Sequence, residues 1–342
     1  GQEADGLVTA EGYVALVIKT LSRAVADGDR IRAVIRGLGI SSDGRGRSLW
    51  APRSEGQVLA VERAYPDLKE LAEVDYIEAH ATSTQVGDAT ELTALASLVS
   101  KNIRPGHQIP IGSVKANIGH TLETAGLASL VKVVLAMEHG QIPPGSTCKT
   151  PNEDFDWQDG PFTLPRGLGP WPRSVSGVRT AAVNAFGIGG LNVHVALREY
   201  QAVEKMQPIE ATSPEPVAII GAGCVLPDAL DREAFFALLQ NGRSAIGSVP
   251  EDRWDADRAL DPSMPQTHHT TAALGGFVRG FEYDWRRHKV PPKQIAAADP
   301  LQFMLLESAD SALADAGLLE KDFDRTRTGV IVGTMFGGDF RN

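Results

Sequence analysis

Apolar positions in residues 1–200 alternate between short runs typical of strands and longer runs typical of helices. Short β-branched runs bounded by glycine or aspartate predict strands at residues 14–21 and 31–40, and further strands are predicted at 74–80 and 192–200. Residues 109–120 are predicted to form a strand that runs into a loop, and residues 178–190 a strand that runs into a glycine turn. Helical apolar spacing predicts helices at residues 54–70, 89–100 and 122–140. Strands that alternate with helices indicate a layered α/β fold with mixed sheets.

The pattern stops near residue 205 and then restarts. Residues 201–215 (QAVEKMQPIEATSPE) are polar, contain proline and have no periodicity, so we expect a linker there. Beyond it, the pattern predicts strands at 216–227 and 328–338 and helices at 232–242 and 300–317. The chain therefore divides into a first segment of residues 1–200, the linker, and a second segment of residues 216–342.

Composition narrows the class of protein only a little. The 342 residues carry a net charge of −10, which argues against general affinity for nucleic acid or an anionic membrane. No apolar run approaches the roughly 18–20 residues that span a bilayer, and the first residues do not resemble a signal peptide. Cys148 and Cys224 lie far apart and outside any CxxC motif, so we expect no metal site, no disulfide and a reducing cytoplasm.

Three clusters place polar residues at the ends of predicted strands, beside loops rich in glycine, serine or threonine. They are residues 78–84 (EAHATST), 115–121 (KANIGHT) and 184–190 (NAFGIGG). His80 and His120, with Lys115 five residues before the second histidine, can line one pocket. Neutral imidazoles can donate hydrogen bonds to a developing oxyanion, and a glycine turn can add backbone N–H groups.

Taken together and in this order, the motifs resemble those of β-ketoacyl synthases, the condensing domains of polyketide and fatty-acid synthases. EAHATSTQVGDATEL resembles their first histidine motif, with Ala81 and Ser83 where glycines are usual. SVKANIGHTLETAGLASLVK resembles their lysine and second-histidine motif. NAFGIGGLNVHVAL resembles their C-terminal glycine loop, with Ile188 for the usual Phe and Leu191 for the usual Thr.

The second segment resembles the opposite end of the same family. VAIIGAGCVLPDALDREAFFALLQNGRSAI is similar to its N-terminal strand and first helix. The resemblance therefore implies the C-terminal part of one ketosynthase domain in residues 1–200, and in residues 216–342 the N-terminal part of a second ketosynthase or chain-length-factor-like domain. The implied fold is α/β, the thiolase-like five-layer αβαβα architecture of two similar halves, present here as two incomplete pieces.

The resemblance also implies an activity and its residues. Ketosynthases catalyse decarboxylative Claisen condensation of an acyl thioester with malonyl-acyl carrier protein. His80 and His120 correspond to the pair that forms the carbanion, and Lys115 to their positioning partner. The pocket loop corresponds to Phe186, Gly187, Ile188 and Gly189, in which the N–H of Ile188 is a candidate oxyanion donor. Thr82, Thr84 and Glu123 are expected to support the site. Glu11 and Glu123 are also expected to pair with Lys115 or with a residue near it.

The family's nucleophilic cysteine has no counterpart in either segment. Its motif is expected after GTMFGG and before ADGLVTAEG, a stretch that this chain does not include. We therefore expect no nucleophile and a catalytically incomplete site. Cys224 is interpreted as a small buried hydrophobe and Cys148 as an ordinary loop residue.

The resemblance further implies partners. We expect no metal and no organic cofactor, because the substrates are carried on the phosphopantetheine of an acyl carrier protein or domain. A homodimer is expected, and one piece is able to fill the place vacated in the other, within a chain or between chains. A non-catalytic, chain-length-factor-like partner is the alternative function. A third possible function is that of a thiolase-like enzyme acting on CoA esters, but the spacing of the histidine motifs, with Lys115, argues against it.

Overall fold

The structure is a computed structural model that describes residues 4, 6–44, 51–101, 103, 106–145, 148, 150–174, 177–187, 189–202, 215–261 and 270–333. Its strands are β1 (Tyr13–Thr20), β2 (Ala33–Ser42), β3 (Tyr76–Glu78), β4 (Ile109–Gly112), β5 (Gln141–Ile142), β6 (Phe162–Thr163), β7 (Gly169–Pro170), β8 (Thr180–Phe186), β9 (Leu191–Arg198), β10 (Val217–Val225), β11 (Ile246–Ser248) and β12 (Leu274–Gly276). Its α-helices are α1 (Leu21–Ala26), α2 (Ser54–Ala64), α3 (Gln85–Val99), α4 (Lys115–Ile118), α5 (Ala125–His139), α6 (Arg232–Gln240), α7 (Ala256–Ala259), α8 (Trp285–His288), α9 (Pro292–Ala297) and α10 (Pro300–Asp315). The 3₁₀ turns are η1 (Leu68–Glu73), η2 (Leu122–Thr124) and η3 (Arg325–Arg327).

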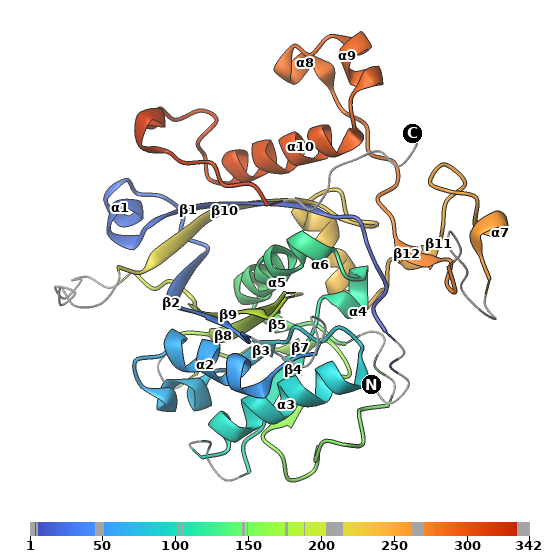
Figure 1. The fold of residues 1–342 in the computed structure, drawn as a ribbon. Helices are drawn as coiled ribbons and strands as arrows, with labels where there is room; N and C mark the ends of the chain where they lie inside the picture. Colours follow the sequence, from blue (N-terminus) through green and yellow to red (C-terminus); the bar gives the residue numbers. More distant parts are fainter. Residues whose placement is uncertain are drawn as a thin grey trace.

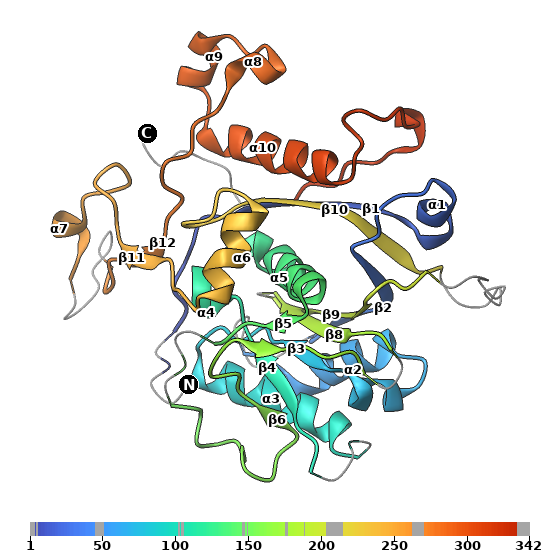
Figure 2. The ribbon, with the colours of Figure 1, turned by 180° about the vertical axis from the view of Figure 1, so that it is seen from behind.

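The elements stack in alternating helical and sheet layers (Figures 1 and 2). Helix α10 covers strands β1 and β10, and α5 with α6 lies on the other side of these strands. Strands β2, β9, β8, β3 and β4 form the next layer, which α2 and α3 cover from outside. This arrangement confirms the αβαβα architecture expected from the sequence.

Strand β10 of the second segment lies inside the sheet of the first segment. The eight-stranded sheet has the order β1-β10-β2-β9-β8-β3-β4-β6. β10 pairs antiparallel with the whole of β1 on one side and with three residues of β2 on the other. The second segment therefore adds a strand to the sheet of the first segment within the same chain, which corresponds to the intramolecular form of the exchange expected from the sequence.

Glycines let a helix approach strands β2 and β10 closely. A Cβ added at Gly39 of β2 would lie 1.7 Å from the backbone oxygen of Ala60 in α2. A Cβ added at Gly223 of β10 would lie 2.2 Å from the backbone oxygen of Ser308 in α10. Both strands carry a Gly-x-Gly sequence at this contact. The absence of side chains at these glycines lets a helix pack closely against each strand in the same way.

An ion-pair network joins the two segments between their helices. Arg32 contacts Glu138 of α5 at 2.6 Å, and Arg232 of α6 contacts the same carboxylate at 3.3 Å. Asp315, at the end of α10, accepts hydrogen bonds from both arginines and from the backbone N–H of Ala222. The four charged side chains are largely buried, so each depends on the others for compensation of its charge.

Some sequence predictions differ from the structure. The strand predicted at 328–338 is wrong for residues 328–333, which form no strand, and its remainder lies outside the described residues. Val330 and Ile331 are 85% and 99% exposed, because no neighbouring strand pairs with them in the described part of the chain. Within residues 109–120, the strand predicted to run into a loop ends at Gly112, and the expected loop contains the short helix α4. Most of the predicted linker, residues 203–214, also lies outside the described residues.

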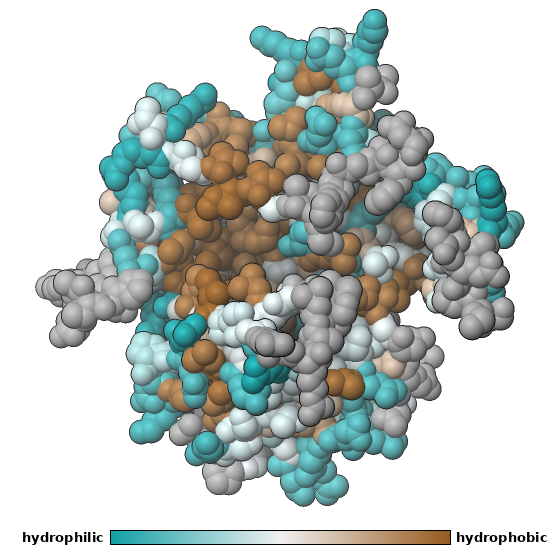
Figure 3. Space-filling model, viewed as in Figure 1, coloured by the Kyte–Doolittle hydropathy of each residue, from teal (hydrophilic) through white to brown (hydrophobic). Residues whose placement is uncertain are grey.

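Apolar side chains gather in a hollow on one face of the molecule, between α10 and the layer of α2 and α3 (Figure 3). The exposed apolar side chains of β1, β2 and β9 are Ile18, Leu38, Ile40 and Leu191. Patches of this kind usually mark an interaction surface. Among the described residues, no helix is both long and apolar enough to cross a membrane.

Asp315→Ala tests whether the two segments fold as one unit. The change leaves Arg32 and Arg232 without their shared partner, so we expect the free energy of unfolding to fall by about 3 kcal/mol. Urea denaturation should show a single transition before and after the change. The matched control is Asp322→Ala, an exposed acid that should change stability by less than about 0.5 kcal/mol. Equal effects of the two changes, or two separate transitions, would contradict the prediction.

Candidate active site

A buried carboxylate fixes the loop that carries His80. The loop leaves β3, and Glu91 of α3 accepts hydrogen bonds from the backbone N–H groups of His80 and Ala81, both at 2.8 Å. Asn184 of β8 donates to the same carboxylate at 2.7 Å. Glu91 is 3% exposed, so these hydrogen bonds supply the compensation that a buried carboxylate requires.

A second buried carboxylate fixes the turn that carries Lys115. Glu78 of β3 is fully buried and pairs with Lys132 of α5 at 2.6 Å. It also accepts a hydrogen bond from Tyr76 and one from the backbone N–H of Val114, which caps the start of α4. Lys115 is the first residue of that helix, and its side chain is only 8% exposed.

The chain near its start and the second segment hold His120 in place. Its backbone N–H donates to the carbonyl of Val8 at 2.7 Å, and its carbonyl accepts from Ala10 at 2.9 Å. On the preceding helix α4, the side chain of Asn117 donates to the carbonyl of Arg243, and the N–H of Ala245 donates to the carbonyl of Asn117. The second segment therefore supports the site as well as the sheet.

The two histidine rings meet edge to face, with centroids 5.8 Å apart. The backbone N–H of Phe186 donates to Nδ1 of His80 at 3.2 Å, and the N–H of Leu122 donates to Nδ1 of His120 at 3.0 Å. Because a neutral imidazole has one acceptor and one donor nitrogen, these contacts assign the proton of each ring to Nε2. Both rings are then hydrogen-bond donors through Nε2.

Burial keeps both imidazoles neutral. It lowers the pKa of His80 well below its usual value and that of His120 to about 4, and the nearby charge of Lys115 lowers both further. Burial also lowers the pKa of Lys115 to about 8, although the carboxylates of Glu78 and Glu91 oppose that shift. At neutral pH the site therefore combines two neutral donors with one ammonium group.

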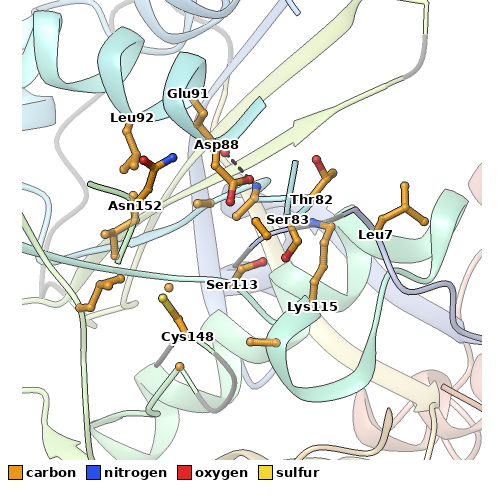
Figure 4. Close-up of a pocket in the computed structure, with 18 of the residues that line it drawn as sticks. Leu7, Thr82, Ser83, Asp88, Glu91, Leu92, Ser113, Lys115, Cys148 and Asn152 are labelled. Carbon is orange, nitrogen blue, oxygen red and sulfur yellow. Dashed lines mark hydrogen bonds between the residues drawn. The ribbon is translucent and has the colours of Figure 1, made fainter. Parts of the chain in front are cut away.

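A cavity of about 360 Å³ opens beside these residues. Its wall includes Lys115, His120, Ser113, Asp88 and, from the second segment, Ile246. Figure 4 shows the side chains of Ser83, Asp88, Ser113, Lys115 and Cys148 around it. Such a cavity, apolar in part and with a few polar groups, suits a small organic ligand. Among the described residues, no three His, Cys, Asp or Glu side chains are placed to hold a metal ion.

Not all of the residues predicted from sequence lie at this site. Thr82 lines the cavity, and its hydroxyl lies 3.3 Å from that of Thr84. In the glycine loop, Phe186 contacts the His80 ring, Gly187 and Gly189 are exposed, and Ile188 lies outside the described residues.

Neither of the two acids proposed as partners of Lys115 contacts it. Glu123 is exposed and has no hydrogen bond or ion pair within the described part of the chain. Glu11 pairs instead with Arg253 of the second segment at 2.6 Å. The expected pairing of Lys115 with either acid is therefore wrong: the carboxylates whose charge acts on Lys115 are chiefly those of Glu78 and Glu91.

The sequence pattern does not predict that Glu91 and Cys148 lie at the site. Glu91 lies within the apolar helical run ATELTALASLVS, and an acid on a buried helix face is a signal that could have identified it. Cys148 was assigned to an ordinary loop, yet it lines the cavity. No periodicity connects it with the histidine motifs, so only the three-dimensional arrangement reveals its position.

Comparison with protein families gives three matches along the chain. A model described as "Beta-ketoacyl synthase, C-terminal domain" matches residues 32–149, and one described as "Ketoacyl-synthetase C-terminal extension" matches residues 151–224. A model described as "Beta-ketoacyl synthase, N-terminal domain" matches residues 214–342. The C-terminal part of the family thus precedes the N-terminal part, in the order that the motifs indicated.

Similar proteins are polyketide synthases. A highly reducing polyketide synthase, cm3B, of Cordyceps militaris is 43% identical over 57% of this chain and 8% of its own length. The pikromycin polyketide synthase component PikAIII of Streptomyces venezuelae is 36% identical over 80% of this chain and 17% of its own length. The chain thus spans less than a fifth of either relative.

Similar solved structures are ketosynthases. The ketosynthase from module 6 of the bacillaene synthase of Bacillus subtilis 168 is 36% identical, with a TM-score of 0.51 over 53% of this chain and 34% of that one. An oxazolomycin ketosynthase domain of Streptomyces albus JA3453 is 38% identical, with a TM-score of 0.50 over 58% of this chain and 36% of that one. The fold is therefore shared with these domains.

The His80 loop contains backbone strain that glycine would relieve. Ala81 and Ser83 have φ of 33° and 60°, a region that side chains disfavour. Because glycine adopts positive φ without strain, we expect Ser83→Gly to raise the free energy of unfolding by about 1 kcal/mol. Ala81→Gly should also raise it. Urea denaturation measures both changes. The control Ala89→Gly, inside α3, should lower it by about 1 kcal/mol. A loss of stability on Ser83→Gly as large as that of the control would exclude strain at this position.

Proposed function

The chain belongs to the β-ketoacyl synthase family, and from that premise we propose that its site forms the carbanion for decarboxylative Claisen condensation in polyketide biosynthesis. The substrate is a malonyl thioester carried by an acyl carrier protein. Loss of CO₂ from the malonyl group breaks a C–C bond, and its electron pair moves toward the thioester carbonyl. The resulting carbanion then attacks the carbonyl carbon of an acyl thioester. A new C–C bond forms, the C–S bond of that acyl thioester breaks, and its sulfur leaves as a thiolate that takes up a proton.

The observation that carries this proposal is the pair of Nε2–H donors. Hydrogen bonds to Nδ1 orient both rings, and burial keeps them neutral. Negative charge that develops on the thioester oxygen is stabilised by preorganised donors in a site with little water. The ammonium group of Lys115 adds positive potential at the cavity wall, which His120 also lines.

Two further features belong to this proposal. The acyl groups are carried as thioesters on phosphopantetheine, so the reaction requires no metal and no free cofactor. The assembly is a homodimer in the cytoplasm, and the apolar hollow in Figure 3 is a surface that such an assembly would cover.

Removing either histidine should slow carbanion formation. We expect His80→Ala and His120→Ala each to lower the rate of malonyl thioester decarboxylation by about 100- to 1,000-fold, because each removes one oxyanion donor. The measurement is release of CO₂ and formation of the acetyl thioester from a malonyl-acyl carrier protein. The matched control is His107→Ala, a change in an exposed loop that should leave the rate unchanged.

Absence of decarboxylation by the unaltered chain would overturn the proposal and favour a non-catalytic, chain-length-factor-like role. An unchanged rate after loss of either histidine would exclude the two-donor mechanism.

The pH dependence of decarboxylation follows from the shifted pKa values. The imidazoles act in their neutral form, so activity should persist well below the ordinary histidine pKa and fall only as pH approaches about 4. Lys115 acts in its charged form, so activity should decline as pH rises through about 8. A rate profile measured from about pH 3.5 to pH 9 checks both limbs. An acidic limb at the ordinary histidine pKa would contradict the assigned state of the rings.

A further inference from the structure

Strand β1 lies at one edge of the eight-stranded sheet. It pairs with β10 on one side, and on its other side no strand pairs with it in the described part of the chain. Helix α10 contacts β1 from one face and α5 from the other (Figure 1). Residues 13–18 of the strand (YVALVI) form an unbroken apolar run. Such a run is typical of a strand in the interior of a sheet, not of a strand at its edge.

The free edge of β1 lacks the features that usually prevent an edge strand from pairing with another chain. Residues 13–18 contain neither a charge nor a proline. The charge of the next residue, Lys19, is compensated by two aspartates of the same chain. The register shift in the β1–β10 ladder places its extra residue, Ile220, in β10, so β1 itself carries no bulge. A regular apolar edge of this kind is a template for one more strand.

Residues 328–333 (TGVIVG) are a segment with the composition of a strand and no sheet to join. They form no strand in the structure, and Val330, Ile331 and Val332 are 85%, 99% and 55% exposed. β-Branched residues of this kind favour the extended conformation of a sheet. In that conformation, Val330 and Val332 point to one face and Ile331 to the other. The segment would therefore be apolar on both faces, as β1 is.

The edge and the segment match each other, but they are not paired within one chain. The apolar hollow between α10 and the layer of α2 and α3 lies along β1 (Figures 1 and 3). Ile18 of β1 is 55% exposed, so a strand added at this edge would bring apolar neighbours to its side chain. Since the structure contains both elements and leaves both unpaired, a second copy of the chain can supply the partner that each one lacks.

We infer that two copies of this chain exchange residues 328–333, and that each copy adds this segment as a strand to the free edge of β1 in the other copy. The inference rests on the homodimer proposed above and names the surfaces that form it. Strand addition of this kind pairs backbone N–H and C=O groups along the edge and buries apolar side chains on both faces. Because the exchange is reciprocal, it gives a closed dimer with two-fold symmetry.

Analytical ultracentrifugation of the unaltered chain and two variants tests this inference. Ile18→Lys places a charge on the accepting edge, and Ile331→Lys places one on the donated segment. Both side chains are exposed, so neither change should affect the fold of the single chain. We expect the unaltered chain to form a dimer and each variant to raise its dissociation constant about tenfold or more. The matched control is Leu274→Lys in β12, which is 56% exposed and should leave the dimer unchanged.

An equimolar mixture of the two variants distinguishes strand exchange from contact between two apolar faces. The Ile18→Lys chain keeps an intact donor segment, and the Ile331→Lys chain keeps an intact edge. One exchange is therefore possible in the mixture, and we expect a heterodimer that is tighter than the dimer of either variant alone. In hydrogen exchange measured by mass spectrometry, residues 328–333 should become protected in the Ile18→Lys chain and stay unprotected in the Ile331→Lys chain.

Three outcomes would overturn the strand exchange. A dimer that both variants retain, or a mixture with no more dimer than either variant alone, would do so while leaving a homodimer through another surface. Open assemblies larger than a dimer would exclude the reciprocal exchange. A monomeric unaltered chain would overturn the homodimer and the exchange together. None of these measurements uses a thioester, so the proposal for carbanion formation is tested separately by decarboxylation.

Discussion

The site depends on two buried carboxylates that accept hydrogen bonds from the backbone of its loops. Glu91 holds the N–H groups of His80 and Ala81, and Glu78 holds the start of the helix that carries Lys115. A buried carboxylate without donors would be very costly, so the loops adopt the conformation that supplies them. The backbone strain at Ala81 and Ser83 is tolerated because these hydrogen bonds fix the conformation of the loop.

A second constraint is that the two segments of the chain complete each other. Strand β10 fills the sheet between β1 and β2, and Arg32, Glu138, Arg232 and Asp315 join the helices around it. The second segment also holds Asn117, three residues before His120, and supplies Ile246 to the cavity wall. The geometry of the site therefore depends on a sheet that neither segment forms alone.

Most strands and helices could be predicted from the sequence alone. The segments that form β1, β2, α5 and α10 carry strong periodic or β-branched patterns, and in each the observed element is the one that the local pattern predicts. It also identified His80, Lys115 and His120 as neighbours, because each follows a strand of one sheet. It did not reveal Glu91, whose role depends on which helix face is buried, nor Cys148, which reaches the cavity from a loop. The strand predicted at 328–338 failed over residues 328–333 because a strand needs a partner, which local pattern does not specify.

The central claim is that His80 and His120 are both neutral and both protonated on Nε2. Nitrogen-15 NMR of the imidazole rings at neutral pH tests it most directly, with His80→Ala and His120→Ala used to assign the signals. The account predicts that both rings show a protonated Nε2 and an unprotonated, hydrogen-bonded Nδ1. A doubly protonated ring, or a proton on Nδ1 of either ring, would contradict it.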